Sequence, residues 1–309
     1  MLSSISSSSG ATIFRISLFA ALIYIAMSAV NYFFPLSSRD NESYLMGVVD
    51  NLERLEATKD DAKRILLLGG SSLGWGVSAE HISKVSGVKT LNLGVQAGIG
   101  YRNIWSIHRE KLDPSRDVIV LSPEVGMIFN SAIITDQYCN VLRLAKLLSP
   151  DYFLCAPIGF VSLLKGIFLG DYLDEGVYKR SGFNAYGDYV YHYELPKTDM
   201  SFGASEYLDQ ESTDNAVREY QAFVGFLADM GFKVVLIPPI AARSVCLDED
   251  LRFSFFQKLA DKALHVFERE FPFCVDDDLF FNTSYHMTKE GVDFKTDVFL
   301  RQLNLLGII

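Results

Sequence analysis

Residues 65–74 have the sequence ILLLGGSSLG, and they indicate the fold class more clearly than any other part of the chain. Four consecutive aliphatic residues followed directly by two glycines are typical of a strand that is buried on both faces of a parallel sheet. The two serines after the glycines can begin a helix. The stretch therefore predicts a strand-to-helix turn, with Ser71 at the carboxyl end of the first strand of an α/β domain.

The same alternation of strand and helix continues along the chain. Aliphatic stretches at residues 90–93, 118–121 and 234–237 predict further strands, and a weaker one is expected around Phe273. Helices are expected at residues 78–85, 101–111, 217–227, 250–270 and 292–306. This alternation predicts a three-layer α/β sandwich, in which helices cover both faces of a central parallel sheet.

Residues 16–34 form a stretch of 19 residues without a charged side chain, long enough to span a bilayer as a helix. Arg15 precedes the stretch, and Asp40 and Glu42 follow it, which favours a cytoplasmic N-terminal tail at residues 1–15. The domain would then be extracytoplasmic, on a single-pass membrane anchor. A cleaved signal peptide is the alternative, since Ala26-Met27-Ser28 offers small residues at a suitable position.

Two segments interrupt the α/β pattern. Residues 35–63 are charged and weakly periodic, and we predict a spacer between the anchor and the domain at 64–309. Residues 130–211 are rich in aromatic side chains and contain an apolar stretch at 152–169, broken by Pro157 and Lys165. We expect an inserted lid beside the site rather than a second membrane span, and a purely structural subdomain is the alternative.

The composition excludes several classes of partner and ligand. A net charge of −10 and the lack of a basic run argue against nucleic acid. The four cysteines form no C-x-x-C pair, so the usual zinc and dithiol patterns are excluded, and we expect neither a metal nor a cofactor. In an extracytoplasmic domain the cysteines can pair, whereas buried free thiols are equally compatible with the sequence. The cysteines are Cys139, Cys155, Cys246 and Cys274.

Ser71 and His286 are the two residues most suited to catalysis. His286 lies just before the C-terminal helix, and Ser71 follows the first strand. Both positions fall at the carboxyl edge of a parallel sheet, where ligands bind in such folds. Residues 70–74 also match G-x-S-x-G, but the nucleophile elbow of α/β-hydrolases follows several strands rather than the first. No Lys-Ser/Thr follows the glycines, so a phosphate-binding loop is not indicated.

With these two residues in place, the chain resembles the SGNH/GDSL hydrolase superfamily, which has a G-D-S block after the first strand and an Asp-x-x-His block before the last helix. Here Gly70 stands where the aspartate is usual. The chain looks most like membrane-anchored members with a G-G-S-[N/S] block, which accompany bacterial cell-surface polysaccharide assembly. The resemblance covers residues 64–309 without the insertion and implies a flavodoxin-like sheet with Ser71 as nucleophile and His286 as its base.

The remaining blocks depart from the family pattern. The second block corresponds to residues 91–98, so Ala97 or Gly98 is expected to supply an oxyanion-hole N–H, beside Gly70 and Ser72. The third block usually ends in an asparagine that donates a second hydrogen bond, but Glu124 lies there, and a carboxylate donates only when protonated. We expect Glu124 to orient another group, to bind substrate hydroxyls, or to weaken the esterase.

The third member of the triad is also altered. In the related pattern an aspartate stands four residues before the histidine, where this chain has Asn282. An asparagine oxygen can orient the imidazole but adds no charge to stabilise the imidazolium. Residues 276–278 are three consecutive aspartates and could supply a carboxylate instead. We favour Asn282 because of its position relative to His286.

These residues predict acyl transfer from an ester, with water as the acceptor in an esterase or a sugar hydroxyl in an O-acyltransferase. The expected substrate is an acylated glycan, most simply an acetylated one, or a small ester. One alternative is a catalytically degenerate protein that binds a glycan or a partner in an envelope assembly system. Another is an esterase that acts on lipids, with the lid at 152–169 against the bilayer.

Overall fold

The computed structural model describes residues 6–33, 38–129, 134–168, 176–198, 210–246, 249–267 and 270–309. The first half of the chain contains, in order, α1 (Ser6–Phe33), α2 (Ser38–Glu42), α3 (Met46–Ala57), β1 (Arg64–Gly69), α4 (Ser71–Gly74), α5 (Ala79–Ser86), β2 (Lys89–Asn92), η1 (Ala97–Ile99), α6 (Tyr101–His108), η2 (Arg109–Lys111), β3 (Asp117–Ser122), α7 (Val125–Phe129) and α8 (Asp136–Ala145). The second half contains α9 (Pro150–Phe168), η3 (Arg180–Gly182), η4 (Tyr191–Glu194), α10 (Gln210–Asp229), β4 (Lys233–Leu236), β5 (Ala241–Ala242), η5 (Arg243–Val245), α11 (Glu249–Leu259), η6 (Ala260–Lys262), β6 (Cys274–Val275), η7 (Asp277–Leu279) and α12 (Lys289–Leu305).

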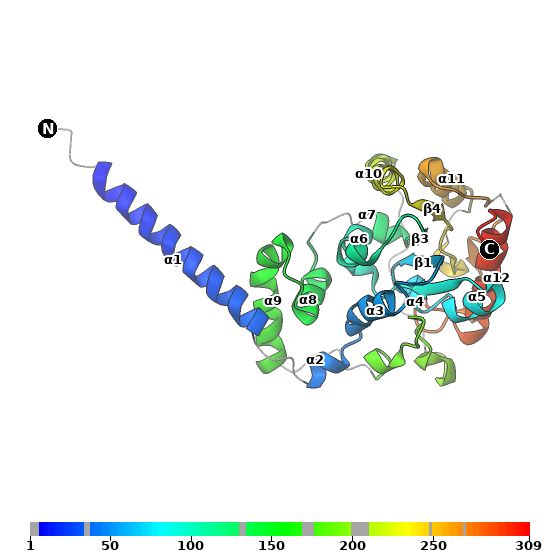
Figure 1. Cartoon of the computed structure of the whole chain (residues 1–309), viewed down its shortest axis with the longest axis horizontal. Helices are drawn as coiled ribbons and strands as arrows, with labels where there is room; N and C mark the ends of the chain where they lie inside the picture. The colour runs from blue at the N-terminus through cyan, green and yellow to red at the C-terminus, as the bar shows by residue number, and fades with distance from the viewer. Residues whose placement is uncertain are drawn as a thin grey trace.

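Four strands form one parallel sheet in the order β2-β1-β3-β4. The chain moves one way across the sheet from β1 to β2 and then back past β1 to β3. Because such crossovers are right-handed, the connecting helices fall on opposite faces. α5 and α12 pack together on one side, and α6 and α10 pack together on the other (Figure 1). The prediction of an α/β domain with a central parallel sheet is confirmed.

The C-terminal part of the domain differs in detail from the prediction. The weak strand expected around Phe273 is β6, which pairs with β5 in a separate two-stranded sheet. The helix expected at 250–270 ends in α11 at Leu259, because Leu264 pairs with the main sheet. The Leu264 N–H donates to Val234 O at 2.9 Å, and the Leu236 N–H donates to Leu264 O at 2.9 Å. Pairing with the sheet outweighs the helical pattern of this segment.

A buried ion pair fastens the start of the two central strands. The Arg64 guanidinium donates two hydrogen bonds of 2.7 Å to Asp117, and neither side chain is exposed. Arg64 also donates to Leu55 O at the end of α3, at 2.9 Å. A buried pair of this kind needs both partners, since either charge alone would remain uncompensated.

The range predicted as a spacer, 35–63, contains α2 and α3. Val48 and Leu55 of α3 are buried in the core of the domain, and Asp50 forms an ion pair with Arg180. The Tyr44 hydroxyl donates to Val95 O at 2.7 Å and accepts from the Trp75 indole at 2.7 Å. α3 therefore belongs to the domain, and the helical spacing of Val48, Leu52 and Leu55 was a signal for it in the sequence.

The N-terminal helix extends away from the domain (Figure 1). Thr12–Phe33 is a continuous helix of 22 residues with a mean hydropathy of 2.1, and only 6% of its most apolar 18-residue stretch is buried. This helix is long and apolar enough to span a membrane, and a signal sequence would have the same properties. The span predicted at 16–34 lies within α1, except for residue 34, which is outside the described residues.

The inserted range 130–211 contains α8, α9, η3 and η4, while residues 130–133, 169–175 and 199–209 lie outside the described part. Both pairs of cysteines form disulfides, so the structure favours pairing over free thiols. Cys139–Cys155 joins α8 to α9, and Cys246–Cys274 joins the end of η5 to β6.

Candidate active site

Ser71 lies where the sequence predicts it, at the first position of α4, directly after β1. A side chain at position 69 would meet Ser122 O at 2.7 Å, and one at position 70 would meet Glu124 Oε1 at 2.6 Å and Ala97 Cα at 2.9 Å. Both glycines are therefore required by close approach of the backbone rather than by an unusual φ. An aspartate in place of Gly70, as in the G-D-S block, would collide with Glu124.

The Glu124 carboxylate holds the serine turn. Its Oε1 accepts the Ser72 N–H at 2.7 Å and the Ser71 hydroxyl at 3.3 Å. The free N–H groups at the start of a helix favour an anion, which explains why a carboxylate is stable at this nearly buried position. Of the three roles expected for Glu124, the geometry favours orientation, because the carboxylate accepts hydrogen bonds from both serines.

His286 and Asn282 are paired as predicted from their spacing. His286 Nδ1 lies 2.9 Å from Asn282 Oδ1, and the Asn282 amide donates to the Tyr178 hydroxyl at 3.0 Å. The bond to Tyr178 directs the Asn282 oxygen toward the imidazole, which favours a proton on Nδ1; the Tyr178 hydroxyl itself lies 3.5 Å from Nδ1. The Thr283 hydroxyl accepts the His286 N–H at 3.0 Å and shapes the turn. Nε2 is then the nitrogen able to accept a proton.

Aromatic side chains surround the histidine. The Trp75 ring stacks on His286, with centroids 4.4 Å apart and planes 13° apart, and His192 packs against Trp75 at 4.6 Å. Burial, together with smaller contributions from the charges of His192 and Lys295, lowers the pKa of His286 to about 3. His286 is therefore neutral at pH 7, as a general base must be, but it is a weak base.

Lys295 of α12 is a buried side chain that the sequence analysis missed. Its Nζ donates to Ser72 O at 2.8 Å. Burial lowers the pKa of Lys295 to about 7, while attraction to Glu124 opposes that shift. The sequence contained a signal for it, because Lys295 interrupts the apolar face of the C-terminal helix between Val292 and Phe299.

Trp75 connects the serine and the histidine. Its N–H donates to Ser71 O at 2.8 Å, its ring stacks on His286, and its carbonyl accepts the Met287 N–H at 3.2 Å. The two predicted catalytic residues thus belong to one wall of the site. The Ser71 hydroxyl is bonded to Glu124, and within the described residues it makes no hydrogen bond to His286. Proton transfer to Nε2 would require the hydroxyl to leave Glu124.

The expected oxyanion donors are not equivalent. The N–H groups of Ser71, Ala97 and Gly98 donate to no acceptor in the described part of the chain, and Ala97 and Gly98 are partly exposed. Ala97 lies against Gly70, and Gly98 faces Gln137 of α8. Ser72 is less suited to bind substrate than predicted, since its N–H is bonded to Glu124 and its hydroxyl is buried without a partner among the described residues.

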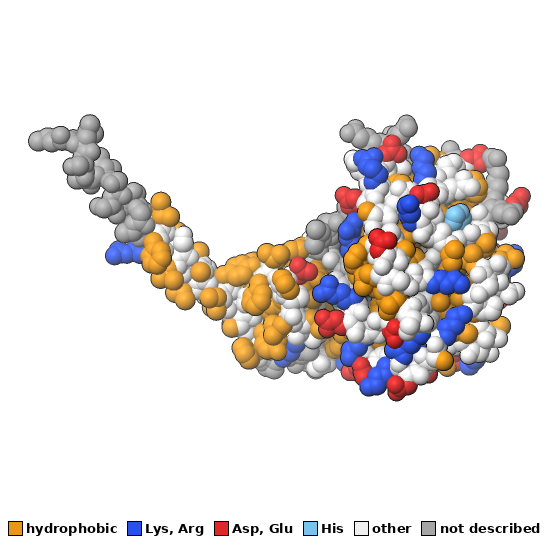
Figure 2. Space-filling view, turned by 45° about the horizontal axis from the view of Figure 1, so that its top comes forward, with side chains coloured by type: hydrophobic (Ala, Val, Ile, Leu, Met, Phe, Trp, Pro, Cys, Tyr) orange, Lys and Arg blue, Asp and Glu red, His pale blue; other side chains and the backbone are white. Residues whose placement is uncertain are grey.

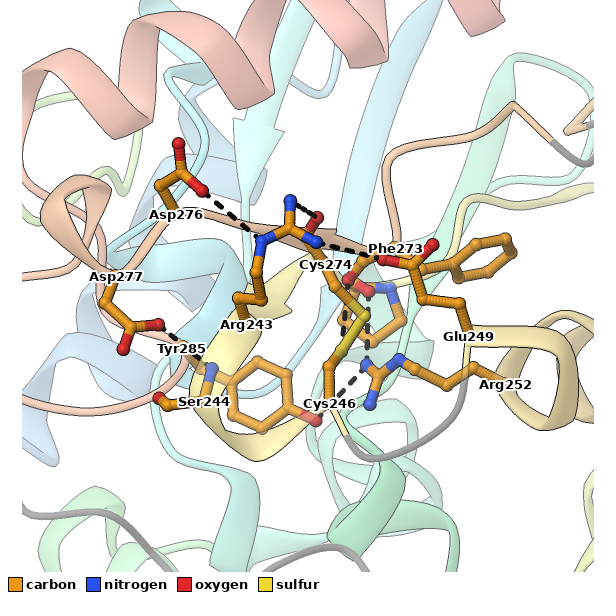
Figure 3. Close-up of a disulfide and its surroundings, with 11 residues drawn as sticks. Arg243, Ser244, Cys246, Glu249, Arg252, Phe273, Cys274, Asp276, Asp277 and Tyr285 are labelled. Atoms are coloured by element: carbon orange, nitrogen blue, oxygen red, sulfur yellow. Dashed lines mark hydrogen bonds and ion pairs between the residues drawn. A yellow bond between two sulfur atoms is a disulfide. The ribbon is translucent and has the colours of Figure 1, made fainter.

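The three aspartates at 276–278 have other partners. The Asp276 carboxylate lies 3.3 Å from Arg243 Nε, and Asp277 accepts the Ser244 N–H at 3.1 Å, beside the Cys246–Cys274 disulfide (Figure 3). Asp278 is fully exposed and lies 3.4 Å from Lys197. Asn282 is therefore the residue that contacts His286 Nδ1, and these carboxylates are directed elsewhere.

No family model, curated protein or solved structure matches the chain. Its site must therefore be interpreted from its own geometry. Within the described ranges, no three His, Cys, Asp or Glu side chains come together to hold a metal ion. Sequence reasoning also missed Tyr178, which directs Asn282, and His192, whose Nε2 lies 2.8 Å from Met287 O. Both come from the inserted segment, where no periodic pattern assigns a residue to the site.

Proposed function

We propose that this chain is a membrane-anchored serine enzyme of the SGNH type that transfers an acyl group from an ester. The observation that carries the proposal is the pair formed by Asn282 and His286, with 2.9 Å between Oδ1 and Nδ1. An oxygen acceptor at Nδ1 favours the tautomer that leaves Nε2 able to take a proton, which is what the third member of a serine triad does.

The mechanism follows from the groups around Ser71. The Ser71 hydroxyl attacks the ester carbonyl and passes its proton to His286 Nε2, which returns it to the leaving alcohol. The N–H groups of Ser71, Ala97 and Gly98 are the available donors for the oxyanion. Water or a sugar hydroxyl then takes the acyl group from Ser71, again with His286 as base, and the free serine is restored.

The order of the strands supports this assignment. A flavodoxin-like sheet has the order 2-1-3-4-5, and β2-β1-β3-β4 corresponds to its first four positions. Leu264 forms a parallel bridge with Val235 of β4, at the edge where a fifth strand would lie. In such a sheet the carboxyl ends of the strands hold the ligand, which is where β1 delivers Ser71.

We place the domain on the extracytoplasmic side of the membrane. Two disulfides are expected in an oxidising compartment and are rare in the cytosol. Arg15 before the apolar part of α1 favours the same orientation. At that location an acetylated surface glycan is the substrate class we propose, and the assembly proteins of such a glycan are the partners it would meet.

The test is hydrolysis of a small aryl acetate by the detergent-solubilised full chain, with Ser71→Ala as the blank. We expect a rate above that blank and, when a glycan hydroxyl is supplied, partition of the acetyl group between water and sugar. A rate equal to the blank would exclude the enzyme proposal for simple esters.

A second function is favoured by one specific observation. The Ser71 hydroxyl donates to Glu124 at 3.3 Å instead of bonding His286, so the resting site is not arranged for proton transfer. A catalytically degenerate protein that binds a glycan or a partner would retain this arrangement. Labelling by a fluorophosphonate separates the two, because only an activated serine reacts.

A further inference from the structure

Helix α9 presents an apolar face to its surroundings. Phe153, Leu154 and Val161 are 53%, 58% and 48% exposed, and they fall on one side of the helix. Residues 152–164 contain no charged side chain at all. A helix on the surface of a soluble domain has a polar outer face, so an apolar outer face indicates that something else covers it.

The opposite face of α9 packs against α1. Asn31, the polar residue in the apolar part of α1, is buried and donates to Ala156 O at 2.8 Å. The Tyr152 hydroxyl donates to Ser28 O at 3.4 Å. A side chain at Gly159 would meet Asn31 Nδ2 at 3.0 Å, so the two helices approach closely there.

The carbonyl that the proline of α9 leaves free finds a partner within this helix pair. Pro157 has no N–H, so the carbonyl four residues earlier, at Phe153, loses its helical partner. The Tyr24 hydroxyl of α1 donates to that carbonyl instead. Compensation of this kind between helices is what permits a proline-containing helix in hydrocarbon, where no water can bond the free carbonyl.

We infer that α9 is a second membrane contact, which lies along α1 in the outer leaflet with Phe153, Leu154 and Val161 against the lipid acyl chains. The inference rests on the proposed anchoring by α1. Hydrophobic side chains continue from α1 onto the helices packed beside it, whereas the domain carries mixed charges (Figure 2). The lipid that surrounds α1 would therefore also surround the outer face of α9.

The contacts between α1 and α9 also set the depth of α9 in the membrane. They involve α1 from Tyr24 to Asn31, a rise of about 10 Å at 1.5 Å per residue. That is about one third of a hydrocarbon core of about 30 Å, at the end of α1 nearest the domain. α8 and residues 150–164 of α9 meet at an angle of 105°, and Cys139–Cys155 joins the two helices. α9 thus enters the interface and returns rather than crossing.

The test is tryptophan fluorescence of the full chain in phosphatidylcholine vesicles whose acyl chains carry bromine, a quencher that acts on contact. Leu154→Trp reports on α9, Phe19→Trp on the exposed part of α1, and Phe226→Trp on an exposed aromatic position of α10 far from α1. The native Trp75 and Trp105 are buried, and the signal of the unmodified chain is subtracted.

We expect Leu154→Trp to lose fluorescence about as strongly as Phe19→Trp, and Phe226→Trp to lose none. Val161→Trp provides a second probe if Leu154→Trp fails to fold. If Phe19→Trp is quenched and Leu154→Trp is not, the inference is overturned while the anchor remains in place. No quenching of Phe19→Trp would overturn the anchor as well. Neither outcome bears on the chemistry of Ser71, which the aryl acetate assay tests separately.

Discussion

The substitution Asn282→Asp would give the site the carboxylate that the proposed triad lacks. In the structure, Asn282 Oδ1 lies 2.9 Å from His286 Nδ1 and Nδ2 donates to the Tyr178 hydroxyl at 3.0 Å. An aspartate keeps the first contact and exchanges the second donor for an acceptor. The Tyr178 hydroxyl can rotate and donate to that oxygen, so the geometry should survive the change.

The expected effect follows from the basicity of His286. Burial is the largest cause that holds its pKa at about 3, and no anion among the described residues contacts the ring to oppose the shift. An opposite charge at hydrogen-bonding distance changes a pKa by about 1–3 units. Replacing the aspartate by asparagine in a serine-protease triad lowers turnover by about 10⁴. We expect Asn282→Asp to raise hydrolysis at least about tenfold, which corresponds to about 1.4 kcal/mol of barrier. The full factor of about 10⁴ is not expected, because this site is built around an amide.

The dependence on pH gives a second signature. His286 acts as a base only when neutral, so activity falls as the pH drops through its pKa. For the unmodified chain this fall is expected near pH 3, and for Asn282→Asp it should move upward by about 1–3 units. The rate of aryl acetate hydrolysis is measured from about pH 2 to about pH 8, so that the acid limbs of both proteins fall within the range.

Asp277→Asn and Asp278→Asn serve as matched controls, since both carboxylates face other partners. Each should leave the rate and its pH profile unchanged. The reasoning would be refuted if Asn282→Asp changed neither the rate nor the acid limb while one of these two variants abolished activity.

Three further predictions concern neighbouring contacts. Glu124→Gln keeps an acceptor for the serine turn and adds an N–H donor, so aryl acetate turnover should rise, by at most about 10²; a fall would mean that the carboxylate itself is needed. Asp117→Asn leaves the Arg64 charge buried without its anion and should lower the free energy of unfolding by about 3–5 kcal/mol, measured by thermal unfolding in detergent; no change would contradict the buried pair. Tyr178→Phe frees the Asn282 amide to flip and should reduce turnover severalfold, but should have little effect in an Asn282→Asp background, where an equal loss would exclude this role.

The parallel sheet was predictable because its strands carry their own signal. Each aliphatic stretch is buried on both faces, and the turn at Gly69 and Gly70 follows directly from β1. The short strands β5 and β6 were not predictable as a pair, since two residues have no period and their pairing depends on contacts distant in the chain. The packing of α3 on the domain was missed although Val48, Leu52 and Leu55 recur at helical spacing, because the charged residues between them are also typical of a spacer.

The candidate site was predictable where a chemically reactive residue type stands at a position that the chain pattern assigns to the edge of the sheet. The spacing between Asn282 and His286 gave their contact, and the position of Ser71 followed from the strand. The contact between Glu124 and the serine turn was not predicted, because it joins two strands whose relative height is known only in three dimensions. Tyr178 could not be assigned, since its hydroxyl reaches Asn282 across 104 residues.

The most direct measurement is to find which residue a fluorophosphonate modifies, by peptide mass spectrometry of the labelled full chain. We predict a single adduct on Ser71, absent from Ser71→Ala, strongly reduced in His286→Ala, and retained in Ser72→Ala, where the altered serine is buried and adjacent. Absence of an adduct from both the unmodified chain and Asn282→Asp would contradict an activated serine. So would an adduct that persists in Ser71→Ala.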